Sequence, residues 1–162
     1  MALSVGQRLP EASLHRMGPE GPEQVETSAL LAGRKVVIFG FVGAFTGDCQ
    51  LSHIPSFVRT RAAFGEKGVD EIIGISVNDP FVMAAFAETT GAASGNVTLL
   101  ADPGSEFTRA IGMDFDAPVV GFYGRSKRYA ILADDGVITA VAEEPDTFTC
   151  EMTLGEAFLV TL

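Results

Sequence analysis

The sequence predicts a layered α/β fold, with a central mixed β-sheet flanked by helices. Apolar, β-branched runs alternate along the chain with stretches whose apolar residues recur every three or four positions. The strongest apolar run leads through a short glycine-containing loop directly into one of these helical stretches. Near the end of the chain, Asp134-Asp135-Gly136 separates two alternating segments, which is a strong hairpin signal. Alternation of this kind buries the central strands under helices on both faces.

Length and charge limit the class of protein. The 162 residues suggest one domain, residues 1–162. A domain of this size buries roughly 70% of its unfolded surface and needs no disulfides or metal to hold a core. The formal net charge of −10 would repel a phosphate backbone, so nucleic-acid binding is not expected.

The sequence also predicts no association with a membrane. The longest run without charged or strongly polar residues, Val36–Phe45, is too short to span a bilayer. The first residues lack the basic start and apolar centre of a signal peptide. We therefore expect a cytoplasmic protein whose thiols are kept reduced.

The first half of the chain is predicted to begin with an arm, residues 1–23, that glycines and prolines interrupt. Ser28 is the expected N-cap of a short helix, and Pro55 is expected to kink a longer one because it lacks an N–H. The predicted elements are a strand near Ala12–Arg16, a turn at Gly18–Gly21, a strand Gln24–Thr27, a helix Ala29–Leu31, the central strand Arg34–Phe41 and a helical stretch from Gly47 to Phe64.

In the second half, Asn78-Asp79-Pro80 predicts a helix start, with a capping residue before a proline at the first helical position. Thr153 is the expected cap of the last helix, and residues 112–127 are predicted to be irregular. The other predicted elements are strands Val69–Val77 and Val97–Ala101, helices Phe81–Thr89 and Ser105–Ile111, the paired strands Arg128–Ala133 and Val137–Ala142, and the helix Leu154–Val160.

The candidate functional residues follow the central strand. Thr46 and Cys49 stand at a T-x-x-C spacing where the loop enters a helix. The N–H groups of a first helical turn have no partners inside the helix and carry the positive end of its dipole. A cysteine there ionises more readily than a free one, whose pKa is roughly 8.5. The sequence therefore predicts a nucleophilic thiolate at Cys49, against the alternative of a buried structural cysteine.

A strand leading into a redox cysteine at a helix start, with a hairpin later, is typical of a thioredoxin-like fold. Thr46 takes the place where a C-x-x-C motif has its first cysteine. The segment Val42–Cys49, VGAFTGDC, resembles the active-site pattern P-x-x-x-T-x-x-C of peroxiredoxins. It is most similar to type-five peroxiredoxins of the redoxin superfamily, which also includes the alkyl hydroperoxide reductase and thiol-specific antioxidant proteins. These have P-G-A-F-T-x-x-C and a downstream H-x-P-x-F, as His53–Phe57 has here.

The resemblance covers essentially the whole chain. Further matching segments are Ser76–Val82, Leu99–Pro103, Lys127–Tyr129, Glu144–Asp146 and Thr149-Cys150. It implies that Cys49 is the peroxidatic cysteine and that Thr46 hydrogen-bonds the peroxide. It also implies that Arg128 stabilises the thiolate and the transition state, and that Cys150 resolves the sulfenic acid. Loop residues implied in substrate binding are Gly43, Phe45, Gly47 and Asp48.

One departure from the family pattern concerns the loop. Val42 stands where the family has a proline, which has a fixed φ and no N–H. We expect valine to loosen the pocket.

Two further residues have alternative interpretations. Cys150 lies in a polar segment that is predicted to be a surface loop, and it could be an incidental cysteine. His53, four residues after Cys49, is expected to be a hydrogen-bonding residue on the helix face, with a role as a base as the alternative.

The resemblance implies a reaction without a metal or organic cofactor. The Cys49 thiolate would reduce hydrogen peroxide or an alkyl hydroperoxide and become a sulfenic acid. A disulfide with Cys150 would then be reduced by thioredoxin, glutaredoxin or glutathione. Family members dimerise through the face near the active site, so a homodimer involving Phe45 and Phe81 is expected. The alternatives are a thioredoxin-like disulfide oxidoreductase and a non-catalytic redox-sensing protein.

Overall fold

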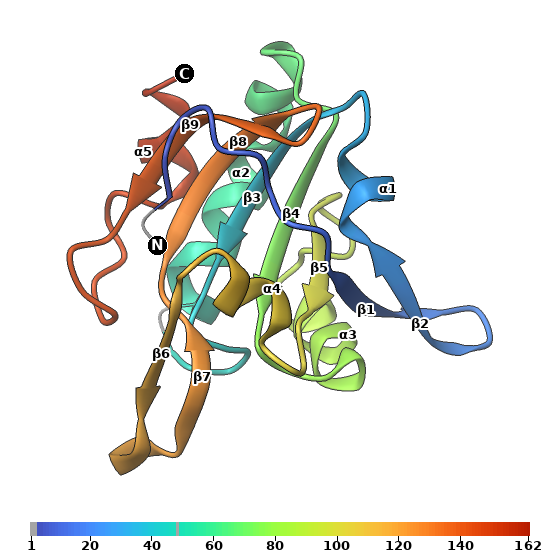
Figure 1. Cartoon of the computed structure of the whole chain (residues 1–162), viewed down its shortest axis with the longest axis vertical. Coiled ribbons are helices and arrows are strands. Elements are labelled where there is room, and N and C mark those ends of the chain that lie inside the picture. The colour runs from blue at the N-terminus through green and yellow to red at the C-terminus, as the bar shows by residue number, and fades with distance from the viewer. Residues whose placement is uncertain (1–2, 48) are drawn as a thin grey trace.

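The fold is built on a seven-stranded sheet with the strand order β2-β1-β5-β4-β3-β8-β9 (Figure 1). The computed structural model describes residues 3–47 and 49–162, with the backbone alone for Cys49 and Gln50. The strands of the sheet are β1 (Ser13–Gly18), β2 (Gly21–Glu26), β3 (Lys35–Gly40), β4 (Glu71–Ser76), β5 (Thr98–Ala101), β8 (Tyr129–Asp134) and β9 (Val137–Glu143). β3 pairs in parallel with β4 and antiparallel with β8. The predicted mixed sheet is confirmed.

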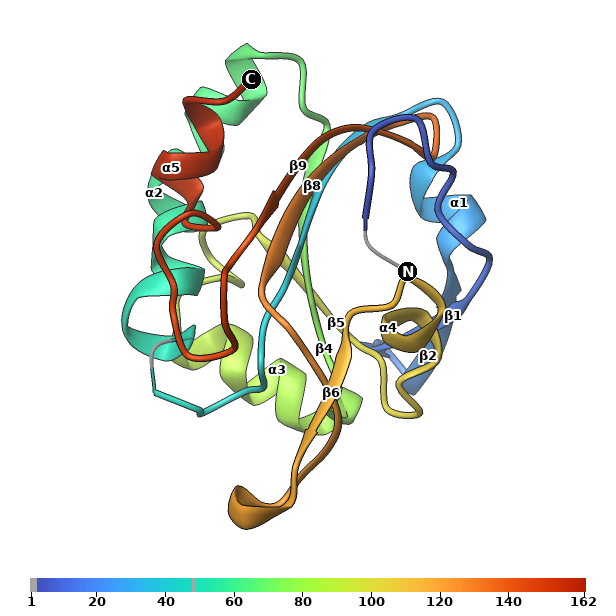
Figure 2. The ribbon, with the colours of Figure 1, turned by 60° about the vertical axis from the view of Figure 1, so that its left-hand side comes forward.

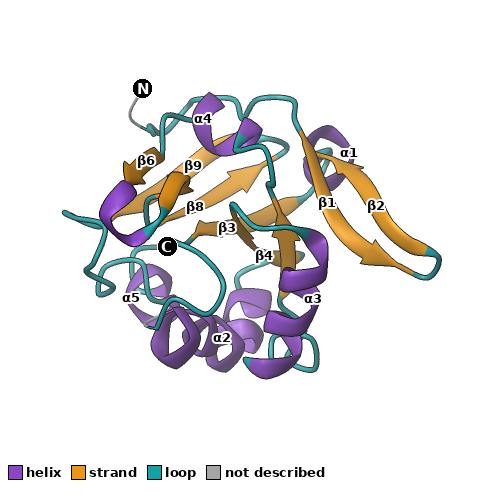
Figure 3. Cartoon of the chain, turned by 90° about the horizontal axis from the view of Figure 1, so that it is seen from below, coloured by secondary structure: helices purple, strands orange, loops and turns teal. Residues whose placement is uncertain are grey.

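Helices cover both faces of this sheet (Figure 3). α2 (Ile54–Glu66), α3 (Pro80–Thr89) and α5 (Gly155–Leu159) lie on one face, and α1 (Thr27–Leu31) and α4 (Glu106–Ala110) lie on the other. The central strand shows why the sheet has two cores. Val37 and Phe39 belong to one buried cluster, and Val36 and Ile38 to the other. Because successive side chains of a strand point to opposite faces, an unbroken apolar run fits a strand that is covered on both sides.

The prediction that residues 112–127 are irregular was wrong. They form a second, two-stranded sheet from β6 (Asp114–Ala117) and β7 (Phe122–Ser126), joined by the short helix η2 (Pro118–Val120). This hairpin projects from the body of the molecule (Figure 2). The rings of Phe115 and Phe122 meet edge to face, with centroids 6.3 Å apart. A four-residue strand with few apolar side chains gives too little periodicity to be recognised in the sequence.

Two of the predicted helix caps were wrong, and one is confirmed. The hydroxyl of Thr27 bridges the N–H of Ala12 and the carbonyl of Pro10, and α1 begins at this residue rather than after Ser28. The hydroxyl of Thr153 donates to the carboxylate of Glu144 and does not cap α5. Asp79 does cap α3, because its carboxylate accepts the N–H of Val82 at 2.9 Å.

Among the described residues, every helix is too short or too polar to cross a lipid bilayer.

Candidate active site

The loop that follows β3 is fixed by hydrogen bonds at several points. The N–H of Ala44 donates to the side-chain oxygen of Asn78 at 2.9 Å, and this oxygen also accepts the hydroxyl of Ser76 at 2.8 Å. The hydroxyl of Thr46 donates to the carbonyl of Gly43 at 2.6 Å. The loop thus has a defined shape just before Cys49. Gly47 has a φ of 79°, a left-handed conformation that suits glycine.

The helical stretch after this loop differs from the prediction. Instead of one helix kinked at Pro55, the chain forms a π-helix, η1 (Cys49–His53), and then α2, with Pro55 in the first turn of α2. Proline has no N–H for the carbonyl four residues before it, so a regular α-helix cannot continue through this point. π-Helical turns are frequent at functional sites. The backbone of Cys49 does begin a helical segment, as predicted, whereas Asp48 lies outside the described residues.

Arg128 lies between β7 and β8 and is buried, with only 3% of its surface exposed. It lines a cavity of about 490 Å³ together with the loop that leads to Cys49. The lining residues are Val42, Phe45, Thr46, Val120, Phe122, Arg128, Thr147 and Phe148. The structure therefore brings together Thr46, Phe45 and Arg128, three of the residues that the sequence singled out.

Val42 is 5% exposed and packs in the same buried cluster as Phe41. We predicted that valine in place of proline loosens the pocket, and this stays a prediction.

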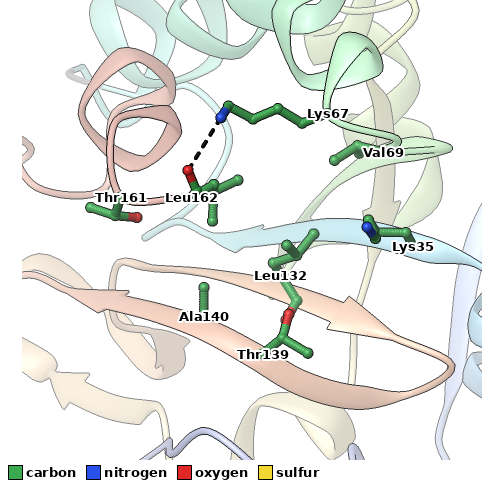
Figure 4. A pocket seen from close by; sticks show the side chains of 8 residues that line it. All are labelled: Lys35, Lys67, Val69, Leu132, Thr139, Ala140, Thr161 and Leu162. Carbon is green, nitrogen blue, oxygen red and sulfur yellow. Dashed lines mark hydrogen bonds between the residues drawn. The ribbon is translucent and has the colours of Figure 1, made fainter.

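A second cavity, of about 460 Å³, lies at the opposite end of β3 (Figure 4). There the ammonium group of Lys67 donates to the carbonyl of Leu162 at 3.2 Å. The lining residues are Lys35, Lys67, Val69, Leu132, Thr139, Ala140, Thr161 and Leu162. It contains none of the residues that the sequence assigned to a site, so the cavity beside Arg128 is the candidate active site.

His53 is the principal site residue whose role the sequence did not indicate. It is a hydrogen-bonding residue, as expected, but it is fully buried rather than on a helix surface. Its Nδ1 lies 3.2 Å from Nη1 of Arg128, and its Nε2 lies 3.2 Å from the carbonyl of Thr153. Burial and then the charge of Arg128 lower the pKa of His53 from 6.5 to about 3, against the hydrogen bond to Thr153. His53 is therefore neutral near pH 7. Because its pKa lies far below that pH, the imidazole is too weak a base to serve well as a general base there.

Arg125 is a second residue that sequence reasoning did not assign to the site. Its Nη1 donates to the carbonyl of Val42 at 3.2 Å, and its guanidinium lies 4.7 Å from the centre of the Phe122 ring. A side chain at Gly43 would overlap this guanidinium. Gly43 therefore permits the approach of Arg125 to the loop. In the sequence, the only indication that Arg125 belongs to the site was its proximity to Arg128.

Cys150 is partly exposed in the segment between β9 and α5. Two carboxylates organise this segment. Oδ1 of Asp146 accepts the N–H groups of Phe148 and Thr149, which lowers the pKa of Asp146. Oε1 of Glu144 accepts the N–H groups of Glu151 and Thr153 and the hydroxyl of Thr153. The predicted surface loop is present, with hydrogen bonds on either side of Cys150.

The pKa of His53 predicts a specific dependence of stability on pH. The unfolded state, with a His pKa of 6.5, binds a proton that the folded state accepts only near pH 3. This contribution to stability is therefore complete above pH 6.5 and is lost as the pH falls toward 3, with a slope of up to about 1.4 kcal/mol per pH unit. Urea unfolding between pH 7 and about pH 4 should show a shallower slope for His53→Asn than for the native chain. Equal slopes in the two proteins would mean that His53 does not cause this loss of stability at low pH.

Comparisons with known proteins extend over nearly the whole chain. The redoxin family model matches residues 4–154. Peroxiredoxin-2E-2, chloroplastic, of Oryza sativa is 43% identical over 91% of this chain and 68% of its own length. Peroxiredoxin-2E, chloroplastic, of Arabidopsis thaliana is 42% identical over 91% of this chain, and the match spans 65% of that relative.

Solved structures agree with these relatives. Reduced Prx3 of Vibrio vulnificus in complex with H₂O₂ is 38% identical, with a TM-score of 0.90 and coverage of 98% of both chains. Peroxiredoxin 5 of Alvinella pompejana is 35% identical, with a TM-score of 0.83 and coverage of 98% of this chain and 97% of its own.

Proposed function

Because the chain belongs to the peroxiredoxin family of thiol-dependent peroxidases, we propose that it reduces hydrogen peroxide and alkyl hydroperoxides with Cys49 as the attacking thiolate. The observation that carries this proposal is the cavity that Thr46 and the buried Arg128 line together, next to the loop that leads to Cys49. The relatives do not favour the alternatives of a disulfide oxidoreductase or a non-catalytic redox-sensing protein.

The proposed reaction is a displacement on oxygen. The Cys49 thiolate attacks the terminal peroxide oxygen, the O–O bond breaks, and the leaving oxygen takes a proton to become water or an alcohol. Cys49 is left as a sulfenic acid. Negative charge moves from sulfur to the leaving oxygen during this step. Arg128 carries a fixed positive charge and a fork of N–H donors, which suits a developing anion.

We assign the loop residues to substrate binding. The hydroxyl of Thr46 and the backbone N–H groups of the loop would position the two peroxide oxygens for attack. The hydrogen bond from Thr46 to the carbonyl of Gly43 supports this role, because it fixes the hydroxyl at the cavity. The loop residues in this assignment are Gly43, Phe45, Gly47 and Asp48.

A peroxide-consumption assay with dithiothreitol tests the function. The native chain should consume peroxide, and Cys49→Ser should reduce the rate to that of dithiothreitol alone, because serine is not ionised at neutral pH and cannot replace the thiolate. Cys150→Ser is the matched control, since dithiothreitol can reduce the Cys49 sulfenic acid directly. Consumption that persists in Cys49→Ser would overturn the assignment. Reduction of insulin disulfides without peroxide consumption would instead support the oxidoreductase.

For the second half-reaction, we propose that the Cys150 thiol condenses with the Cys49 sulfenic acid, forming a disulfide and releasing water. A thiol reductant (thioredoxin, glutaredoxin or glutathione) then restores both cysteines. One equivalent of H₂O₂ should therefore yield an intrachain Cys49–Cys150 peptide pair in non-reducing mass spectrometry. A persistent Cys49 sulfenic acid, or glutathione adduct formation at the same rate in Cys150→Ser, would make Cys150 a bystander.

Residues 1–162 are proposed to act as one domain that assembles as a homodimer. Phe45 lines the cavity and is 49% exposed, and Phe81, in the first turn of α3, is 63% exposed. Burying such rings on a second copy would be favourable. A monomer in light scattering at micromolar concentration would contradict the dimer.

The proposed compartment is the cytoplasm, because thiols are kept reduced there. Two of the relatives are chloroplastic.

A further inference from the structure

Four residues from separate parts of the chain form a closed ring of hydrogen bonds beside the candidate active site. Nη1 of Arg128 lies 3.2 Å from Nδ1 of His53, and Nε2 of His53 lies 3.2 Å from the carbonyl of Thr153. The N–H and hydroxyl of Thr153 donate to Oε1 of Glu144 at 2.7 and 2.8 Å. The N–H of Glu144 donates to the carbonyl of Arg128 at 3.3 Å, which closes the ring.

Chemistry fixes the direction of each bond in this ring. The guanidinium of Arg128 can only donate, so Nδ1 of His53 must accept. The carbonyl of Thr153 can only accept, so Nε2 of His53 must carry the proton. These two requirements select one tautomer of a neutral imidazole. Burial gives the selection its strength, because His53 and Thr153 are 0% exposed and Arg128 is 3% exposed, and water cannot replace a lost partner easily.

The ring also includes the segment that carries Cys150. Oε1 of Glu144 accepts the N–H of Glu151, next to Cys150, as well as the two groups of Thr153. Asp146 holds the other side of Cys150 through Phe148 and Thr149. Of the two carboxylates, Glu144 alone belongs to the ring that reaches Arg128. Variants of these two carboxylates can therefore distinguish the effect of ordering the segment from the effect of connecting it to Arg128.

We propose that Glu144 is a positioning residue that makes the placement of Arg128 depend on the folded state of the Cys150 segment. This inference rests on the proposed peroxidase function. While Glu144 holds the segment, the carbonyl of Thr153 orients His53, and His53 orients Arg128 toward the cavity. When the segment is displaced as Cys150 bonds to Cys49, His53 loses the carbonyl that selects its tautomer. Arg128 regains its support after the disulfide is reduced and the segment returns.

The matched variants Glu144→Ala and Asp146→Ala test this proposal in a Cys150→Ser background, which isolates the oxidation of Cys49. Each removes one carboxylate that anchors the same segment. Rapid quenching with peroxide, followed by mass spectrometry, gives the rate of Cys49 oxidation. We expect Glu144→Ala to slow it by about tenfold to a hundredfold, since small misplacements of a catalytic group cost that much. Asp146→Ala should stay within about twofold, as expected of a surface change away from the ring.

Nitrogen NMR of the imidazole rings supplies a readout that general loosening would not produce. The chain has two histidines, so His15→Gln assigns both signals. The His53 signals should show the Nε2–H tautomer in the native chain and in Asp146→Ala, and a changed tautomer pattern in Glu144→Ala. If Glu144→Ala fails to fold, Glu144→Gln retains the shape and one acceptor oxygen while it removes the charge.

The results separate this proposal from the peroxidase itself. Equal rates in the two variants, or an unchanged His53 tautomer in Glu144→Ala, would overturn the role of Glu144. If peroxide leaves Cys49 unoxidised in the parent chain, the proposed function fails. The NMR comparison then decides whether the ring orients His53. Identical His53 spectra in Glu144→Ala and Asp146→Ala would overturn the role of Glu144.

Discussion

Arg128→Met is expected to slow peroxide reduction by about 100- to 1000-fold, the usual cost of removing a donor that stabilises transition-state charge. Methionine is similar in length and apolar, so it keeps much of the packing at a position that is 3% exposed. It removes both the charge that faces the cavity and the partner of Nδ1 of His53. Single-turnover oxidation of Cys49 by H₂O₂, followed in a rapid-quench experiment, measures the loss.

Lys127→Met is the matched control for this result. Lys127 is the preceding residue, carries the same charge and is exposed. Its removal changes the net charge by the same amount without changing the cavity lining, so a rate within about twofold is expected. Similar losses in both variants would mean that Arg128 acts only through the overall field, and its assignment as a catalytic residue would be wrong.

Phe57→Ala is expected to have the largest effect on stability, about 3–5 kcal/mol of the free energy of unfolding. The Phe57 ring is 0% exposed and stacks on the ring of Phe39, with centroids 4.1 Å apart. It also packs against His53 at 5.8 Å. The truncation leaves a cavity between α2 and β3 that the surrounding residues cannot fill. At about 2–4 °C per kcal/mol for a chain of this length, the melting temperature should fall by roughly 6–20 °C.

Phe148→Ala provides the comparison, because it deletes the same ring from a side chain that is 73% exposed. A change within about 0.5 kcal/mol is expected there. Urea unfolding monitored by circular dichroism measures both variants. A loss below about 1 kcal/mol for Phe57→Ala would show that the core relaxes around the deletion.

Local sequence patterns were sufficient for the main elements of the fold. The unbroken apolar run of β3 and the hairpin signal at Asp135-Gly136 predicted the strands on which the site is built. Asp79 before Pro80 predicted the start of α3. In each case the residues that determine the element lie within a few positions of one another, so their interactions can be inferred from the sequence.

The missed features depend on residues that are far apart in the chain. The partners of His53 lie 75 and 100 positions away, at Arg128 and Thr153. Thr153 was predicted to be a cap, yet its hydroxyl is used by Glu144, nine positions before it. Polar side chains have several possible partners, and only the tertiary fold decides which of them lies within hydrogen-bonding distance.

The π-helix from Cys49 to His53 has a consequence for the spacing of this motif. Each residue of a regular α-helix advances the chain by about 100° around the axis. The number of residues between Cys49 and Pro55 therefore sets an angular phase as well as a length. Deleting one residue from η1 and closing it to an α-helical turn would rotate the backbone position of Cys49 relative to the buried face of α2. The interval between Cys49 and Pro55 is for this reason far less tolerant of insertions and deletions than the exposed tip of the β6–β7 hairpin, where Val119 is 98% exposed.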